Sequence, residues 1–283
     1  MSANDDVTVV IPCFDYGRFL GEAVASALGQ EGGPPRVVVV DDGSSDPVTL
    51  KAFEDLPEGV RLLRQSCAGV AAARNAGAGV AETPLLLMLD ADDRLRPAAL
   101  AMLRGPLEAD PALGFAYGDA QFFGAWSGRL AFPDFDGYRL LYRSIVTATS
   151  LVRRELFEAV GGFDVELPGY EDWDFYLGAL ERGFGGRRVP EVVLDYRRHE
   201  TSRLADDRAD YRRRYAAIRA KRAALYARSS ELAATSSLGA GGRLVYRTWW
   251  ARRPLPGAVE QALYRLAFRA SSISSAKRRA SSG

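Results

Sequence analysis

The sequence is poor in the residues that build disulfide and metal–thiolate sites. Its 283 residues include two cysteines and one histidine. Cys13 and Cys67 are far apart, and neither belongs to a Cys-X-X-Cys pair. We therefore expect two buried thiols in a reducing compartment and assign them no chemistry.

Long apolar runs are also absent. The most apolar stretches, 37–40 and 85–89, fall far short of the ~20 residues that a membrane-spanning helix needs. Residues 1–6 are polar and acidic, without the basic start and apolar centre of a secretory signal. These features predict a cytoplasmic protein that does not span a membrane.

Charge is nearly balanced overall but unevenly distributed. Residues 1–200 hold 19 Lys and Arg against 31 Asp and Glu, whereas residues 201–283 hold 18 against 5. This asymmetry predicts an acidic folded body followed by a basic extension with a task of its own. A hydrophobic content of 47% is sufficient for a large globular domain in the body.

The first 110 residues alternate between two kinds of pattern. Short β-branched or leucine-rich runs predict buried strands, and the segments between them have helical spacing or composition. The expected strands cover 7–11, 37–40, 60–64 and 85–89, and the expected helices cover 19–28, 48–56, 69–80 and 97–107. Such alternation predicts an α/β fold with a parallel sheet, which binds ligands at the carboxyl ends of its strands.

The remainder is less regular. We expect short strands at 115–117, 122–123, 150–152 and 189–196, the last interrupted by Pro190 and so placed at a sheet edge, with helices at 154–160 and 173–182. Beyond residue 203, an Ala- and Arg-rich stretch to 228 predicts a long exposed helix. Residues 229–242 have the composition of a linker, and the tail from 271 is predicted to be disordered.

Two of the predicted strands end in clustered aspartates. Asp90, Asp92 and Asp93 follow the fourth strand, where their mutual repulsion would be costly without a cation. Mg²⁺ and Mn²⁺ prefer oxygen ligands, and Mg²⁺ commonly binds one or two carboxylates together with substrate phosphates. The alternative is a solvated acidic turn that caps the next helix.

The second cluster, 41–46, follows the second strand with the sequence Asp-Asp-Gly-Ser-Ser-Asp. A carboxylate fixed here can accept a hydrogen bond from a base N–H or a ribose hydroxyl. Taken alone, such a cluster is more commonly explained by an Asx-turn followed by a helix cap.

Five segments in order resemble a family 2 glycosyltransferase of the GT-A fold. The resemblance covers roughly residues 5–203 and implies a Rossmann-like, mostly parallel sheet flanked by helices. The matching segments are 7–15 (VTVVIPCFD), 40–46 (VDDGSSD), 69–77 (GVAAARNAG), 89–93 (LDADD) and 161–164 (GGFD) followed by 171–174 (EDWD). It further implies a nucleotide-sugar-binding half at 1–110 and an acceptor and catalytic-base half at 111–203 of one domain, before the extension at 204–283.

The resemblance implies roles in binding the donor. Pro12, Phe14 and Asp15 would line the base pocket, with Phe14 stacking on the base. Asp42 would receive the base N–H, and Arg74 would lie beside the nucleotide. The family's DxD element falls on Asp90 and Asp92. Asp92 and Asp93 would contact metal and ribose, in an order that the sequence leaves open.

It also implies the catalytic and remaining metal-binding residues. Asp172 would be the general base that takes the acceptor proton in a single in-line displacement with inversion, and Glu171 is its competitor. A helix N-terminus enriched in acids is the alternative reading of this pair. His199, the only histidine, would ligate the metal or contact the diphosphate.

The sequence favours a UDP- or dTDP-sugar as donor and leaves the acceptor open among a glycan, a lipid-linked glycan and a small metabolite. The aromatic residues of the irregular middle are predicted mostly to pack in the core; they are Trp126, Phe132, Tyr138 and Tyr142. The basic extension is compatible with peripheral contact with the inner face of a membrane, with packing on the body or with formation of a homo-oligomer. It is not expected to bind nucleic acid.

A non-catalytic nucleotide-sugar-binding scaffold and a sugar nucleotidyltransferase are the alternative functions. The latter usually has a Gly-rich phosphate loop after its first strand, which residues 12–17 do not form.

Overall fold

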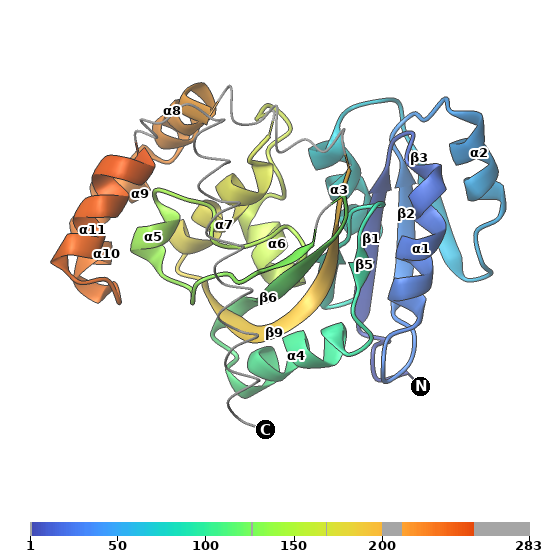
Figure 1. Cartoon of the computed structure of the whole chain (residues 1–283), viewed down its shortest axis with the longest axis horizontal. Coiled ribbons are helices and arrows are strands. Elements are labelled where there is room, and N and C mark those ends of the chain that lie inside the picture. Colours follow the sequence, from blue (N-terminus) through green and yellow to red (C-terminus); the bar gives the residue numbers. More distant parts are fainter. Residues whose placement is uncertain (1, 126, 168, 200–210, 252–283) are drawn as a thin grey trace.

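The computed structural model describes residues 2–125, 127–167, 169–199 and 211–251. Within them a nine-stranded mixed sheet runs through the body, flanked by helices (Figure 1). Its strand order is β3-β2-β1-β4-β8-β6-β9-β5, with β7 paired to β6. The predicted α/β architecture with a mostly parallel, curled sheet is confirmed.

The first half of the sheet is parallel. It contains β1 (Val7–Cys13), β2 (Arg36–Asp41), β3 (Val60–Arg64) and β4 (Leu85–Met88). The strands β1, β2 and β4 lie close to their predicted positions because nearly uninterrupted apolar runs are buried on both faces of a parallel sheet. The partly exposed β3 also matches its prediction and lies at the edge of the sheet. The connecting helices are α1 (Gly17–Leu28), α2 (Pro47–Glu54) and α3 (Val70–Gly79), and α4 (Ala99–Ala109) follows β4 and the two-residue β5 (Arg94–Leu95).

Two apolar cores form on opposite faces of the sheet, because alternate residues of a strand point to opposite sides. Val9 of β1 packs in one core with α1 and α4. Val10 packs in the other core with α3, α6 and α7. Gly77 lets α3 approach β1 closely, since a Cβ at this position would lie 2.2 Å from Cγ1 of Val10. The close packing holds the start of α3 beside the strand ends.

The second half of the sheet joins the first through β8 (Leu151–Arg153), which pairs antiparallel with both β4 and β6. The two short strands predicted at 115–117 and 122–123 are one strand, β6 (Leu113–Gly124). It pairs with β7 (Gly128–Leu130) and lies parallel to β9 (Gly185–Arg198). The sheet is therefore continuous across the proposed boundary at residue 110.

Pro190 does not place its strand at an edge, because β9 lies between β6 and β5. The ladder with β6 shifts register here: Val189 pairs with Gly118, and the next pair is Val192 with Asp119. Pro190 falls in this irregularity, where no ladder hydrogen bond is required from its nitrogen.

Three helices cover the second half of the sheet. They are α5 (Gly137–Leu140), α6 (Arg154–Val160) and α7 (Glu171–Glu181). Tyr138 and Tyr142 are buried, as predicted for the aromatics of this region, and Phe132 packs partly buried against both cores. Trp126 lies outside the described residues.

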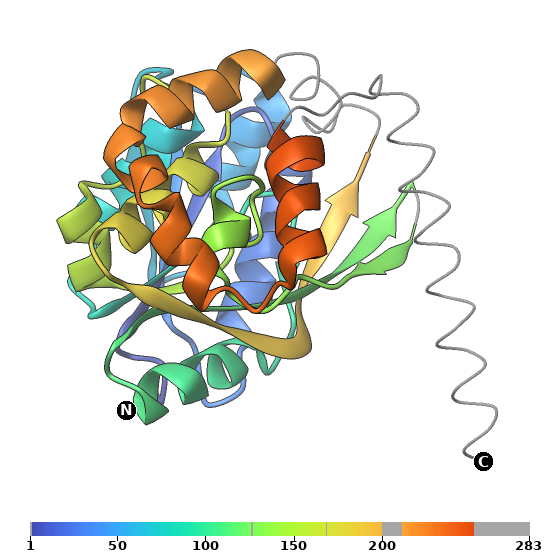
Figure 2. The same cartoon turned by 90° about the vertical axis from the view of Figure 1, so that its left-hand side faces the viewer.

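The described part of the basic extension packs on this side of the body (Figure 2). It comprises α8 (Tyr211–Lys221), α9 (Ala223–Ala227), α10 (Ser229–Thr235), α11 (Ala240–Val245) and the π-helical turn η2 (Tyr246–Trp250). The prediction of a linker at 229–242 was wrong, because Asp136 accepts hydrogen bonds from Ser236 and Ser237 and fixes the connection between α10 and α11. The long helix predicted at 203–228 is divided at Arg222, between α8 and α9. The tail predicted from 271 lies outside the described residues.

Two smaller findings complete the fold. Cys13 is buried as predicted, but Cys67 is exposed, because it lies in the loop after β3 and not in a strand. No helix in the described part of the chain is both long enough and apolar enough to span a bilayer.

Candidate active site

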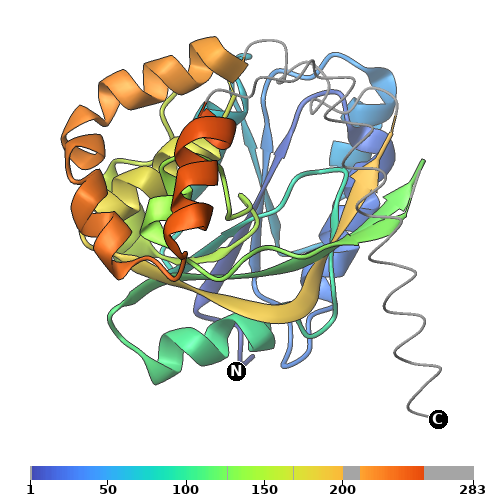
Figure 3. The same ribbon diagram turned by 60° about the vertical axis from the view of Figure 1, so that its left-hand side comes forward.

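The acidic clusters of the sequence lie at the carboxyl ends of neighbouring strands. Asp42 directly follows β2, and Asp90 follows β4 by two residues, with β1 between the two strands. The helices α5–α7 and α8–α11 lie to the side of these strand ends, away from α1 and α2 (Figure 3). The parallel half of the sheet thus brings together acids that are almost fifty residues apart in sequence.

Asp42 is buried and organises the loop before α3. Its Oδ1 accepts hydrogen bonds from Gln65 Nε2 at 2.7 Å and from the Ala68 N–H at 2.8 Å, and its Oδ2 accepts from the Gly69 N–H at 2.8 Å. Gly69 has a left-handed φ of 91°, which a side chain would disfavour. The carboxylate therefore fixes the loop through which the chain enters α3.

Asp15, which follows β1, fixes the loop after β2. Its Oδ1 accepts hydrogen bonds from the N–H groups of Ser45 and Asp46, both at 2.8 Å. Asp46 caps α2 by accepting from the Thr49 N–H at 2.9 Å. Asp41 Oδ1 accepts from the Ser44 N–H at 2.8 Å, so a turn stabilised by a side chain and a helix cap are both present in the 41–46 cluster.

Phe14 is the exposed aromatic of this region. Its side chain is 44% exposed, whereas the preceding Pro12 and Cys13 are buried. An exposed ring beside two ordered loops offers a flat surface for stacking a planar ligand.

Arg74 connects the strand ends to α7. It projects from α3, is only 4% exposed, and donates from Nη2 to Asp90 Oδ1 at 2.7 Å and from Nη1 to Glu171 Oε1 at 2.8 Å. Burial opposes the charge, but the two carboxylates outweigh it and raise the pKa of Arg74 above its ordinary value. The guanidinium is a fixed positive charge between the two proposed halves of the site.

Asn75 provides a second connection from α3. Its side chain donates to the Phe163 carbonyl and accepts from the Phe163 N–H, both at 2.8 Å. Gly162, with a left-handed φ of 76°, precedes this contact. The adjacent Arg74 and Asn75 therefore contact the segments 89–93, 161–164 and 171–174, and the sequence alone assigns no role to Asn75.

Asp172 lies in the first turn of α7, partly buried, and its Oδ1 accepts from the Trp173 N–H at 2.7 Å. Burial and the neighbouring Glu171 carboxylate raise the pKa of Asp172 to about 7, although Arg74 opposes this rise. A carboxylate with such a pKa is suited to proton transfer near neutral pH. By contrast, Glu171 is committed to its ion pair with Arg74.

Asp92 contacts the only histidine. His199 Nε2 lies 2.9 Å from Asp92 Oδ2, just beyond the end of β9, and its ring contacts Tyr16 and Phe19. Burial and the neighbouring Asp90 raise the pKa of Asp92, and His199 counteracts the rise. The structure thus brings together two residues that we expected to bind metal.

Asp93 contacts the backbone of β9. It is buried and accepts a hydrogen bond from the Arg197 N–H at 2.8 Å, which fixes β9 against the strand-end loop. Arg197 also donates to the Asp92 carbonyl and pairs with Glu22 of α1, both at 2.8 Å. No group of three or more metal-ligating side chains is preformed among the described residues.

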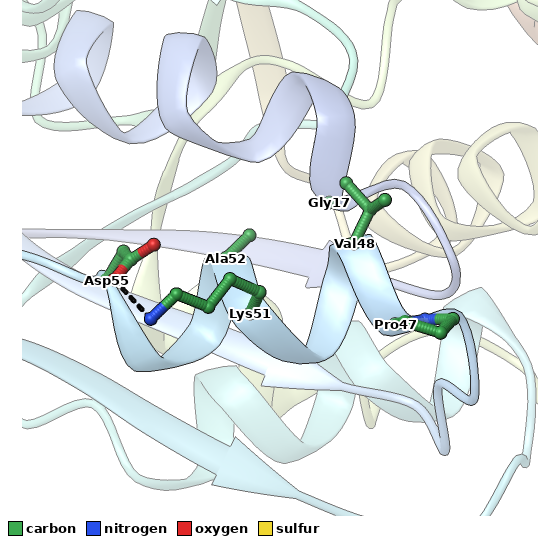
Figure 4. Close-up of a pocket in the computed structure, with 6 residues that line it drawn as sticks. All are labelled: Gly17, Pro47, Val48, Lys51, Ala52 and Asp55. Atoms are coloured by element: carbon green, nitrogen blue, oxygen red, sulfur yellow. Dashed lines mark ion pairs between the residues drawn. The ribbon is translucent and has the colours of Figure 1, made fainter.

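A separate hollow lies on the outer surface between α1 and α2 (Figure 4). It is lined by Gly17, Pro47, Val48, Lys51, Ala52 and Asp55, and Lys51 pairs with Asp55 across 3.1 Å. Neither strand-end acidic cluster lines it, so we do not assign it to the candidate site.

The fold and the site together define a class of protein. A mixed, mostly parallel sheet of this order, flanked by helices on both faces, is the GT-A fold. The Glycosyl transferase family 2 model matches residues 8–161, more than half of the chain. The protein belongs to this family.

Curated relatives agree. An uncharacterized glycosyltransferase of Bacillus subtilis, YwdF, is 29% identical over 202 residues, covering 67% of this chain and 73% of YwdF. A PGL/p-HBAD biosynthesis glycosyltransferase of Mycobacterium bovis is 31% identical over 195 residues, covering 66% of this chain and 74% of its own. The succinoglycan biosynthesis protein ExoO of Rhizobium meliloti is 42% identical over 95 residues, 32% of this chain and 27% of its own.

Solved structures of S. aureus TarS share the fold. The complex with UDP-GlcNAc superposes with a TM-score of 0.66 at 16% identity, covering 88% of this chain and 74% of the TarS chain. The complex with UDP has a TM-score of 0.59 at 16% identity, covering 88% and 71%.

Proposed function

We propose that the protein is an inverting, metal-dependent glycosyltransferase that moves a sugar from a nucleotide diphosphate to a hydroxyl acceptor. The observation that carries this proposal is the position of Arg74, which bonds Asp90 of the DxD element and Glu171 of the acidic pair. The ion pairs bring Asp172, next to Glu171, to the side of the strand-end cluster. A base and a donor site must lie this close for direct transfer.

UDP-sugars and dTDP-sugars are the proposed donors. TarS, whose fold this chain shares, has been solved with UDP and with UDP-GlcNAc. In this chain, exposed Phe14 would stack on the base, beside Pro12 and Asp15. Asp42 would receive the base N–H with a free lone pair of its carboxylate, since its three present donors leave acceptor capacity.

Mg²⁺ or Mn²⁺ is the proposed cofactor. The residues present fit such an ion: Asp92 and His199 approach within 2.9 Å of each other and supply one oxygen and one nitrogen ligand. A site with few protein ligands suits Mg²⁺, which commonly completes its coordination with water and substrate phosphates. When bound, the ion would neutralise charge on the leaving diphosphate. Asp93 would act mainly by fixing β9 through the Arg197 N–H.

Asp172 is the proposed general base. Its raised pKa keeps a proton-accepting group poised near neutral pH, and the Arg74–Glu171 ion pair holds its helix in place. Removing the acceptor proton as the hydroxyl attacks leads to a single displacement, which inverts the anomeric carbon. Glu171 is the less suitable base, because proton uptake would break its ion pair with Arg74.

The acceptor is proposed to bind over residues 111–203 and to be a hydroxyl of a glycan, a lipid-linked glycan or a small metabolite.

The described extension exposes Leu244, Val245 and Trp249 beside exposed Arg247. Apolar and cationic side chains together support peripheral contact with an anionic membrane surface rather than a second copy of the chain. Co-sedimentation with phosphatidylglycerol vesicles tests this, and retention by purely zwitterionic vesicles or by neither would contradict it.

A donor screen tests the activity without knowledge of the acceptor. Purified protein is incubated with UDP-, dTDP- and GDP-sugars and Mn²⁺ or Mg²⁺, and the slow release of nucleoside diphosphate to water is measured. We expect UDP or dTDP release that stops in EDTA. Pyrophosphate release from a nucleoside triphosphate and a sugar phosphate would indicate a nucleotidyltransferase. Donor binding without any release, with all acceptor classes supplied, would indicate a scaffold protein.

A further inference from the structure

The C-terminal extension forms ion pairs with α7, the helix that carries the acidic pair Glu171 and Asp172. Asp174 lies in the first turn of α7 and is only 1% exposed. Arg222, between α8 and α9, is 8% exposed and donates from Nε to Asp174 Oδ1 and from Nη2 to Oδ2, both at 2.8 Å. This is a two-pronged, buried ion pair between the extension and the catalytic body.

Other groups extend this contact. Arg222 Nη1 also bonds Glu181 at the far end of α7, at 3.0 Å. Lys221 bonds both Asp174 and Asp164 at 2.6 Å. Two adjacent cations thus hold α7 at both ends.

Gly178 provides room for the guanidinium. It lies one turn after Asp174, in the interior of α7, and a Cβ there would be 2.8 Å from Arg222 Nη2. Glycine in a helix interior costs about 1 kcal/mol relative to alanine. The close approach of Arg222 gives a physical reason for this glycine.

The residue before α7 does not cap the helix with its side chain. Tyr170 precedes the helix with a left-handed φ of 62° and makes no side-chain cap. Such a backbone conformation is unfavourable for a non-glycine residue and persists only where the surroundings enforce it. Long-range contacts therefore help to fix the first turn: Glu171 with Arg74, Asp174 with Arg222, and the Trp173 indole N–H with the Leu140 carbonyl.

Stability alone is a weak reason for this arrangement. A buried ion pair often adds no net stability over apolar side chains of the same volume. Its two parallel hydrogen bonds do, however, fix direction and distance. We infer that Arg222 is a positioning residue of the transferase, which acts through Asp174 to set the orientation of Asp172 on α7. The extension is then a working part of the active site, and this inference rests on the proposed function.

The experiment compares Arg222→Lys, which keeps the charge but loses the fork, with the charge-free double variant Asp174→Asn/Arg222→Gln. Arg228→Lys is the matched control, because Arg228 pairs with Glu231 at 3.0 Å on the exposed surface. The rate of metal-dependent UDP release and the Kd for UDP are measured for each folded variant. A misplaced catalytic group costs up to about a hundredfold in rate.

We expect both variants to lose tenfold or more in kcat, with the Kd for UDP within twofold of wild type and the control unchanged. Gly178→Ala, which crowds the guanidinium, should reduce kcat in the same direction. If Arg222→Lys does not fold, the double variant decides, since it leaves no unpaired buried charge. Wild-type kcat in the folded variants would overturn the inference, as would parallel losses of kcat, UDP binding and native protein.

Failure of this inference differs from failure of the proposed function. If wild-type protein releases no nucleoside diphosphate, or if Asp172→Asn releases it at the normal rate, the proposed function is wrong. If wild type is active and Asp172→Asn is inactive, but the Arg222 variants retain full kcat, only the positioning role is wrong.

Discussion

Arg74 and Glu171 are 97 positions apart in the chain, yet Nη1 of Arg74 donates to Oε1 of Glu171 at 2.8 Å. The same guanidinium donates to Asp90 at 2.7 Å. One buried cation thus joins the strand-end acids to the helix that carries Asp172. The contact sets the width of the candidate site.

Arg74→Met should be strongly destabilising, because it leaves the buried carboxylate of Glu171 without its cation. Removing one partner of a buried pair costs roughly 3–5 kcal/mol. Urea unfolding measures the loss. The double variant Arg74→Met/Glu171→Gln should recover much of it, whereas Arg36→Met, which breaks an exposed pair with Glu82, should change the free energy of unfolding by less than about 1 kcal/mol. A loss no larger for Arg74→Met than for Arg36→Met would contradict the central role of Arg74.

Asp172→Asn should reduce UDP release by at least about a hundredfold while the Kd for UDP stays the same, because the amide cannot take a proton. In wild type, the rate should rise with pH through a value near 7, as the carboxyl group ionises. A pH–rate profile on the described donor assay measures both effects. An unchanged rate in the variant would remove Asp172 from the base role.

Asp172→Asn should also change the thermal stability of the protein in a pH-dependent way. The pKa of Asp172 in the folded protein, about 7, lies above the ordinary value near 4 of the unfolded chain. The folded protein therefore holds an extra proton between these pH values, and stability falls as pH rises through that window. Asp172→Asn escapes this loss, so its Tm should exceed that of wild type at pH 8 by more than it does at pH 5. A Tm difference independent of pH would show that the pKa is not raised.

Metal binding should depend on Asp92 and His199. Asp92→Asn and His199→Ala should each weaken Mn²⁺-dependent UDP binding by about tenfold or more, because each removes one ligand and the partner that orients the other. Isothermal titration with and without EDTA measures this. Glu82→Gln, on the exposed surface, serves as the control. UDP binding that is equally tight in EDTA would contradict the metal site.

Asp42→Ala should disturb the entry to α3. It removes the acceptor of the Ala68 and Gly69 N–H groups, and an ordinary hydrogen bond contributes about 0.5–1.5 kcal/mol to stability. We expect lower stability together with weaker UDP binding, as measured by thermal shift with and without UDP. Asp55→Ala, on the surface beside Lys51, should change neither. Normal UDP binding in Asp42→Ala would separate this residue from the donor site.

The first half of the fold could be predicted closely because most of its strands are apolar runs, and two of them, β2 and β4, end in turn-forming acids. Residues 60–64 form the predicted strand, and both acidic clusters lie at strand ends. The insertion of β8 between β4 and β6 could not be predicted, because nothing in the sequence of a three-residue strand indicates which strands will pair with it. The partnership of Arg222 with Asp174 was missed for a related reason. An arginine in an Ala- and Arg-rich helix is normally solvated, and only the tertiary packing shows that this one is buried.

The uninterrupted hydrogen-bonded path from β3 to β5 restricts how the molecule can open. Strands of the first 110 residues and strands of the following segment belong to one sheet, and the two groups are joined where β4 pairs with β8. Enzymes that close two lobes around a substrate need a hinge between them, and a shared sheet provides none. We therefore expect the proposed donor and its nucleotide product to enter and leave through local movement of loops at the rim, with little change in the spacing between the strand-end acids and α7.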